Sequence, residues 1–240
     1  MEHQTNLSSH KKLTVIIPVF NEQTTIESLI NHVLAVDCIE LEVIVVDDFS
    51  TDATREILEQ IIKPKVSRII YHDTNQGKGA AIRSGIQSAT GDFLIFQDAD
   101  LEYNPQEYPV LLSPLLEDLA DVVYGSRFLT TQEHRVLYYW HSVGNRFLTF
   151  LSNIFSNLNL TDMETCYKVF RMDVIKQINI EENHFGMEPE ITAKISKIPD
   201  IRIYEVGISY HGRTYKEGKK INWKDGLKAI WCILKYNLFR

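Results

Sequence analysis

The sequence predicts an α/β protein with a Rossmann-like, mostly parallel central sheet and helices on both faces. Two continuously apolar runs rich in β-branched residues, LTVIIPVF (13–20) and LEVIVVDD (41–48), are typical of strands buried on both faces. Helical segments of about 10–15 residues separate such runs, which indicates βαβ crossovers between parallel strands. The 240 residues are enough for one domain of this class.

The first half of the chain alternates regularly. Strand 13–20 is followed by a helix with one apolar face, formed by Ile26, Leu29, Ile30, Val33 and Leu34. After strand 41–48 a second helix is expected to open near Ser50–Thr51, with Asp52 in its first turn. We then expect a strand at 67–72, a helix from NQGKGAAIRSGIQSA, a strand at 92–97, a helix over about 105–117 and a strand at 121–128.

The pattern is less regular after about residue 130. We expect an aromatic-rich helix around 134–158, a short strand at 166–171, a helix near 187–197, a strand at 201–210 and a final helix at 222–238. The polar residues 1–12 are predicted to form a disordered tail, 13–215 a single domain, and 216–240 a basic amphipathic C-terminal helix. We expect this C-terminal helix to contact a membrane or a partner protein.

Charge and cysteine usage narrow the class of protein. The net charge of −7 argues against a general nucleic-acid binder. Residues 211–240 carry eight Lys and Arg against two acids, a net +6 that leaves −13 for the remainder and predicts an anionic ligand or surface at this end. Three scattered cysteines, no apolar leader and no run of about 20 apolar residues predict a cytoplasmic chain without membrane spans.

Polar clusters follow four predicted strands: PVFNE, DDFS, DAD and GSR. Ligands of open parallel sheets bind at the carboxyl ends of the strands, so these clusters should converge on one site. For Asp47 and Asp48 taken alone, capping of the next helix is an equally good interpretation. Four converging clusters favour a ligand.

The stretch FLIFQDADLEYNP (93–105) suggests which ligand. Asp98 and Asp100 point the same way if the strand geometry persists, and two carboxylates repel each other unless a cation or proton joins them. A Walker loop and a dinucleotide fingerprint are both missing. We therefore expect Mg²⁺ or Mn²⁺ between these carboxylates and the phosphates of a nucleotide.

Five spaced motifs carry a family resemblance: VIIPVFNE, VIVVDDFSTDAT, NQGKGAAIRSG, GDFLIFQDADLEYNP and GSRF. They resemble family 2 glycosyltransferases of the GT-A fold, and most closely the polyprenyl-phosphate branch that includes dolichyl-phosphate mannose synthases. TDMETCYKVFR and RTYKEGKK are similar to two further segments of that branch, so the likeness covers about 13–215. Cys166, Lys168 and Glu102 replace its commoner Gly, Arg and Gln, departures that bear on the donor sugar more than on the reaction.

The resemblance implies roles for the matching residues. The nucleotide-sugar would be bound by Pro18, Phe20, Asn21, Glu22, Asp48, Lys78 and Asp98. The metal would be held by Asp98 and Asp100, with Glu102 as a third ligand. Asp100, Arg127 and Arg146 are the candidate catalytic residues, and the acceptor phosphate would be gathered by Arg127, Arg146, Arg213 and Lys219. For Lys78 the alternative is a solvated helix N-terminus.

The acceptor decides whether a base is required. A lipid phosphate, with a second pKa near ~6, arrives ionised and needs none, whereas a hydroxyl needs a carboxylate such as Asp162 or Glu164. Asp162 could instead order a loop or cap a helix. Two segments are typical of helices that lie at a membrane interface: residues 136–160, and the face of the final helix that contains Trp223, Leu227 and Trp231. The alternatives are a core helix for the first and packing on the body or in a dimer for the second.

The sequence therefore predicts a metal-dependent inverting transfer of a hexose, mannose or glucose. The donor would be a GDP- or UDP-hexose and the acceptor a dolichyl or undecaprenyl phosphate. We expect peripheral binding at the cytoplasmic face of a membrane, directly or through a separate membrane subunit, and leave homo-oligomerisation open. Rival hypotheses are a family 2 transferase with a sugar hydroxyl acceptor, a nucleotide-sugar-binding module without turnover and, more remotely, a nucleotidyltransferase.

Overall fold

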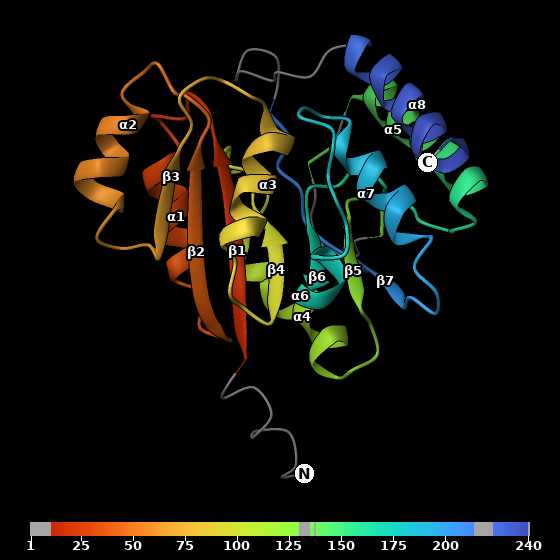
Figure 1. Ribbon diagram of the computed structural model, residues 1–240, viewed down its shortest axis with the longest axis horizontal. Helices are drawn as coiled ribbons and strands as arrows, with labels where there is room; N and C mark the ends of the chain where they lie inside the picture. The colour runs from red at the N-terminus through yellow and green to blue at the C-terminus, as the bar shows by residue number, and fades with distance from the viewer. Residues whose placement is uncertain (1–10, 130–134, 137, 214–222, 240) are drawn as a thin grey trace.

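In the described part of the chain, seven strands form where the sequence is apolar and β-branched, and they make one sheet (Figure 1). The computed structural model describes residues 11–129, 135–136, 138–213 and 223–239. The sheet order is β3-β2-β1-β4-β6-β5-β7. The strands are β1 (Lys12–Val19), β2 (Glu40–Asp47), β3 (Arg68–Tyr71), β4 (Phe93–Phe96), β5 (Val122–Ser126), β6 (Lys168–Arg171) and β7 (Ile203–Gly207).

Helices connect the strands and cover the sheet, with α3 in front of it and α1 behind it in Figure 1. Glycine makes the close approach of α3 possible, because a Cβ on Gly85 would lie 2.6 Å from a methyl group of Ile16. The helices are α1 (Ile26–Leu34), α2 (Thr54–Ile57) continued by a π-helical turn η1 (Leu58–Ile62), α3 (Lys78–Ser88), a 3₁₀ turn η2 (Pro105–Glu107) leading into α4 (Tyr108–Leu116), α5 (Tyr139–Ser156), α6 (Met172–Ile175), α7 (Met187–Ile195) and α8 (Trp223–Leu238).

The prediction of a mostly parallel sheet is confirmed, with β6 as the exception. β1 pairs in parallel with β2 and β4, β2 with β3, and β5 with β7. β6 runs antiparallel to both β4 and β5, so that Val169 lies opposite Ile95 on one side and Val123 on the other. Four residues between two long connections carry no local signal for direction, which explains why the sequence predicted this strand without its orientation.

Several element boundaries differ from the predicted ones. The second helix begins at Thr54, because the Asp52 carboxylate accepts a hydrogen bond from the Thr54 amide at 3.0 Å and so lies before the helix, not in its first turn. The strands expected at 121–128 and 201–210 are shorter, at Val122–Ser126 and Ile203–Gly207, and the one-turn helix α6 was not expected. None of these differences moves a predicted site residue away from a strand end.

The strand order creates a crevice beside β1. The chain runs from β1 outward to β2 and β3, then crosses back to place β4 on the other side of β1. In open α/β sheets, ligands bind at such a topological switch point, at the carboxyl ends of the strands. The segments after β1 and β4, which contain PVFNE and DAD, meet there.

Helices α5 and α8 pack against each other beyond the end of the sheet (Figure 1). The most buried residues of α5 are small and polar, Thr149, Ser152 and Ser156, and Leu148, Leu151 and Phe155 pack partly buried against the core. Phe147 and Phe150 face outward, at 52% and 61% exposed. Tyr236 and its buried neighbours hold α8 against α7, which leaves Trp231 exposed on the opposite face. No helix in the described part of the chain is both long and apolar enough to cross a membrane.

Candidate active site

A cavity of about 790 Å³ opens at the carboxyl ends of the central strands. Its walls come from the loops after β1, β2, β4 and β5 and from α3, α5, α7 and α8. Segments that are far apart in the sequence therefore contribute to one site. The sequence-predicted residues that line it are Pro18, Phe20, Glu22, Asp48, Lys78, Asp98, Asp100, Glu102, Arg127 and Arg213.

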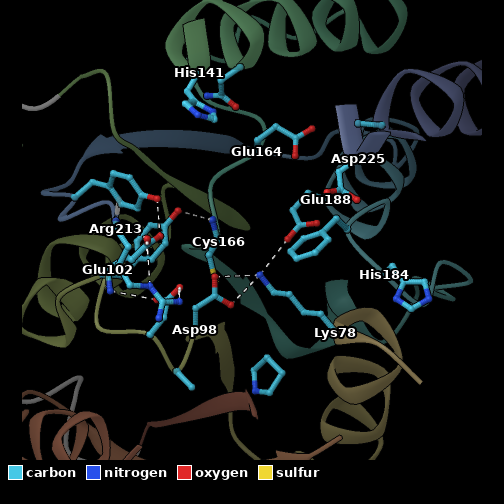
Figure 2. A pocket seen from close by; sticks show the side chains of 18 of the residues that line it. Lys78, Asp98, Glu102, His141, Glu164, Cys166, His184, Glu188, Arg213 and Asp225 are labelled. Atoms are coloured by element: carbon cyan, nitrogen blue, oxygen red, sulfur yellow. Dashed lines mark hydrogen bonds and ion pairs between the residues drawn. The ribbon is translucent and has the colours of Figure 1, made fainter. Parts of the chain in front are cut away.

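Lys78 lies between two carboxylates on the floor of this cavity (Figure 2). Its Nζ is 2.8 Å from Asp98 Oδ1 and 3.2 Å from Glu188 Oε1. Burial alone would lower the pKa of this amine, but the charges of Asp98 and Glu188 raise it well above its ordinary value, so Lys78 stays charged. Lys78 is thus a partly buried, paired cation of the site and not a solvated helix N-terminus.

Arg213 holds a second group of carboxylates. Its guanidinium lies 3.0 Å from Asp100 Oδ2, 3.6 Å from Glu102 and 3.8 Å from Glu22. Burial, and then the charges of Asp98 and Glu102, raise the pKa of Asp100 to about 7 despite this cation. The cluster holds more negative charge than Arg213 compensates, which is the situation expected of residues that bind a further cation.

Glu102 is already bound by protein groups. Its carboxylate accepts hydrogen bonds from the Tyr210 hydroxyl and from the Arg213 amide, both at 2.6 Å. These contacts attach the segment that ends at Arg213 to the DAD loop. Glu102 as a third metal ligand therefore stays a prediction, and its observed contacts give it a positioning task.

Asp48 clamps the loop that leads into α3. Its carboxylate accepts hydrogen bonds from the Gly77 amide at 2.7 Å and the Gln76 amide at 2.9 Å, and it lies 2.7 Å from His72 Nδ1. Gly77 has a φ of +99°, which a residue with a side chain rarely adopts. Asp48 thereby sets the position from which Lys78 enters the cavity, and its part in binding the nucleotide-sugar stays a prediction.

Arg127 is bound to the fully buried Asp162. The Arg127 Nε and Nη2 atoms lie 2.6 and 2.7 Å from the two oxygens of Asp162, and Asn145 donates a further bond at 2.9 Å. Burial would raise the pKa of this carboxyl, but Arg127 and the hydrogen bonds hold it below its ordinary value. Asp162 therefore orders this part of the site, and it has no free oxygen with which to act as a base.

The sequence pointed to Glu164 but not to Glu188. Glu164 was a candidate base, whereas no local signal distinguished Glu188, which lies in the first turn of α7. Burial, and then the charge of Glu188, raise the pKa of Glu164 to about 8. Cys166, which lines the same wall, has a thiol pKa raised well above its ordinary value by burial and by Asp98, so this thiol is not an activated nucleophile.

Three predicted residues do not line the cavity in the described structure. The Asn21 side chain accepts a hydrogen bond from the Thr51 amide at 2.8 Å and so joins the loops after β1 and β2. Arg146 is exposed on α5, with its guanidinium 5.3 Å from the centre of the Phe128 ring. Lys219 lies outside the described residues. The roles predicted for these three residues stay predictions.

The candidate metal ligands fit a hard divalent cation such as Mg²⁺ or Mn²⁺ only in part. Within the described ranges no group of three or more His, Cys, Asp or Glu residues is arranged to hold a metal ion. Asp98 and Asp100 supply two carboxylates at the cavity surface, and Mg²⁺ commonly binds through one or two carboxylates with substrate phosphates completing its shell. The site therefore fits a metal that arrives with a nucleotide diphosphate better than a resident one.

The α/β sheet and the carboxylate-lined cavity at its switch point are those of GT-A glycosyltransferases, the class that the motifs predicted. The family model of glycosyl transferase family 2 matches residues 14–178, more than half of the chain. The chain belongs to glycosyltransferase family 2. Its predicted family is thus confirmed.

Curated relatives include members of the polyprenyl-phosphate branch. Dodecaprenyl-phosphate galacturonate synthase of Rhizobium johnstonii is 26% identical over 87% of this chain and 61% of its own length. Dolichol-phosphate mannosyltransferase of Pyrococcus furiosus is 25% identical over 94% of this chain and 64% of its own. The chain thus spans a little over three fifths of the length of these two relatives.

Solved structures with the same fold have been determined with nucleotide and metal. Glucosyl-3-phosphoglycerate synthase from Mycobacterium tuberculosis, in complex with Mn²⁺, UDP and glucosyl-3-phosphoglycerate, has a TM-score of 0.74 and 20% identity over 96% of this chain and 81% of that one. The same enzyme with Mg²⁺ and UDP has a TM-score of 0.72 and 20% identity, with the same coverage. At this level of identity the likeness establishes the fold.

Proposed function

We propose that this glycosyltransferase moves a hexose, mannose or glucose, from a GDP- or UDP-hexose to a polyprenyl phosphate. One observation carries the proposal. A single cavity joins the carboxylates Asp98 and Asp100 and the cations Lys78, Arg127 and Arg213 to the helices α5 and α8, whose outward faces are apolar. A charged donor and a lipid-linked acceptor phosphate are the two substrates that such a cavity suits.

The charged end of the cavity suits the leaving diphosphate. Asp98 and Asp100 would hold Mg²⁺ or Mn²⁺, whose charge would stabilise the nucleoside diphosphate as it leaves. Lys78 and Arg213 already lie at these two carboxylates, within 2.8 and 3.0 Å. Each therefore stands where it would meet phosphate oxygens bound beside Asp98 and Asp100.

Arg127 is suited to position an acceptor phosphate. Two of its guanidinium nitrogens are held by Asp162, and its flat face lies 5.0 Å from the centre of the Tyr210 ring, so its orientation is constrained before a ligand arrives. A phosphate already ionised near neutral pH needs no general base. The reaction then requires alignment of two anions and neutralisation of their charges.

The outward faces of α5 and α8 suit a membrane surface. Phe147, Phe150 and Ile154 are each more than half exposed on α5, as are Leu227 and Trp231 on α8. Exposed apolar residues on adjoining helices are typical of proteins that bind a membrane or another protein. We infer peripheral attachment at the cytoplasmic face, directly or through a separate membrane subunit.

The two polyprenyl-lipid relatives support the same acceptor class, since their names specify a dodecaprenyl phosphate and a dolichol phosphate. The test is transfer of radiolabel from GDP-mannose, UDP-glucose and related donors to a short-chain polyprenyl phosphate, with Mg²⁺ or Mn²⁺ and again with EDTA. We expect label in the lipid phase that EDTA abolishes. Donor hydrolysis that depends on metal, without lipid label from any donor, would contradict the lipid acceptor.

A hydroxyl acceptor is the second candidate, and Glu164 is the observation that favours it. This carboxyl lines the cavity, its Oε1 has no hydrogen-bond partner within the described structure, and its pKa is raised to about 8, in the range suited to a base. Glu164→Gln would then abolish transfer to a sugar hydroxyl without weakening donor binding. Under the lipid-phosphate proposal the same variant would lose turnover only in proportion to weaker donor binding.

A further inference from the structure

Buried Glu188 and partly buried Glu164, on one wall of the cavity, each carry a buried oxygen that no group in the described part of the chain satisfies. Glu188 is 4% exposed; its Oε1 contacts Lys78, while its Oε2 has no hydrogen-bond partner. Glu164 Oε1 is likewise buried and without a partner. Both residues line the cavity, and Figure 2 places their side chains next to each other above Lys78. Buried acceptors of this kind are unusual in folded proteins, and in a substrate cavity they indicate a catalytic or binding role.

Within the described residues, the cations nearest this wall are engaged by other groups. Lys78 is shared between Asp98 and Glu188, and Lys168 donates a hydrogen bond to the Thr165 carbonyl and lies 5.1 Å from the centre of the Tyr124 ring. Arg127 is bound to Asp162. The free oxygens of Glu164 and Glu188 consequently face a ligand that must bring hydrogen-bond donors.

The parts of the substrates differ in what they offer. A diphosphate is anionic and presents acceptors, so it would be repelled, and a polyprenyl chain has no polar groups. The hexose presents several hydroxyl donors. We infer that Glu164 and Glu188 bind hydroxyl groups of the transferred sugar, and that the enzyme selects a neutral hexose over a hexuronate. The inference rests on the proposed function, because it takes the donor to be a nucleotide-hexose.

Selection against a hexuronate follows from charge. The extra carboxylate of such a sugar would enter a wall where Glu188 and Asp98 already share the charge of Lys78, in a site where burial strengthens repulsion. It would also bring no donor for the two unsatisfied oxygens. Discrimination of this kind depends on a repulsive element in addition to favourable contacts.

Calorimetry with the full chain and Mg²⁺ tests the inference, using UDP, GDP, UDP-glucose, GDP-mannose and UDP-glucuronate. For the nucleotide that binds, we expect Glu164→Gln to weaken binding of the neutral nucleotide-hexose about five- to tenfold, because the amide offers one acceptor oxygen where the carboxyl group offers two. Binding of the nucleoside diphosphate alone should change less than about twofold. Glu188→Gln should have the same selective effect on the sugar, together with any effect through Lys78.

Glu107→Gln is the matched control. Glu107 also has a buried oxygen without a partner in the described structure, but it does not line the cavity, and its other oxygen accepts a hydrogen bond from the Ser209 amide. This variant should bind all the nucleotides as the wild type does. Thermal melting of each variant shows whether it is folded.

Each adverse outcome has a distinct meaning. Equal weakening of the nucleotide and the nucleotide-hexose in folded Glu164→Gln would overturn the inference and indicate a structural role. Loss of turnover at unchanged nucleotide-hexose affinity would overturn it in favour of a base. Tighter wild-type binding of UDP-glucuronate than of UDP-glucose would remove the predicted selectivity. Failure of the wild type to bind any of the nucleotides would overturn the proposed function, and this inference with it.

Discussion

Replacing Asp162 by Asn tests whether this carboxylate is an anchor or a base. Asp162 is fully buried and accepts two bonds from the Arg127 guanidinium, at 2.6 and 2.7 Å, one from the Arg127 amide at 3.1 Å and one from Asn145. Removing one partner of a buried ion pair typically costs ~3–5 kcal/mol, because the other charge is left uncompensated. For a domain of this size such a loss corresponds to a fall in Tm of ~6–20 °C.

Denaturation followed by circular dichroism measures this loss. The control is Asp118→Asn, which removes a carboxylate that is 74% exposed from its pairs with Arg171 and Arg202 and should change the free energy of unfolding by no more than ~1 kcal/mol.

The pKa of Asp162 is lowered in the folded state. Its stabilisation should therefore be complete above the unfolded-state pKa of ~3.9 and be lost as the pH falls through the lower folded-state pKa.

The reasoning makes Asp162 a positioning residue for Arg127. Asp162→Asn should lose stability, and whatever activity it loses should accompany weaker use of the acceptor phosphate. A variant with wild-type stability and no turnover towards any acceptor would refute this account and make Asp162 a catalytic base.

Three further outcomes are expected. Asp100→Ala should lower turnover at least about 100-fold with the fold retained, and the turnover that remains should no longer be sensitive to EDTA. Unchanged turnover would eliminate the assignment of Asp100 as a metal ligand. The pKa of Glu164 is raised to about 8 in the folded protein, so ionising this carboxyl opposes folding. The free energy of unfolding of Glu164→Gln should therefore increase relative to that of the wild type as the pH rises from ~4 to above 8. Equal pH profiles of the two proteins would contradict the burial argument. The double variant Phe147→Ser, Phe150→Ser should sediment with anionic lipid vesicles at least about tenfold less than the wild type, at unchanged Tm. Leu119 is exposed to a similar degree but lies away from these helices, so Leu119→Ser should sediment as the wild type does. Equal effects of the two variants would argue against a specific membrane face.

Much of the site could be predicted because it lies at strand ends. The apolar runs determined β1, β2 and β4, and Glu22, Asp48, Asp98 and Asp100, which follow these runs, line the cavity. Glu188 could not be found in this way, since it lies on a helix whose local sequence predicts only a buried surface. Its partnership with Lys78, 110 residues away, depends on where α7 packs.

The faces of α5 could not be assigned from the sequence either. The pattern distinguished an apolar side from a polar one, and the expected alternatives were a core helix or an interfacial helix. In the folded chain the small polar residues Thr149 and Ser152 face the interior and Phe150 faces outward. Leu148, Leu151 and Phe155 pack partly buried against the core, but the deepest positions of this helix hold small side chains, so polarity alone does not identify its buried face.

The sequence by itself determined the α/β class, the family and the set of polar residues at the carboxyl ends of the strands, because each of these depends on local periodicity or on short motifs. Only the tertiary structure decided which charges are paired. Arg213 meets Asp100 across 113 residues, Asp162 holds Arg127, and Glu164 and Glu188 each keep an oxygen that no described residue contacts by a hydrogen bond. The strength of a charge interaction depends on distance and burial, and these exist only once the chain is folded.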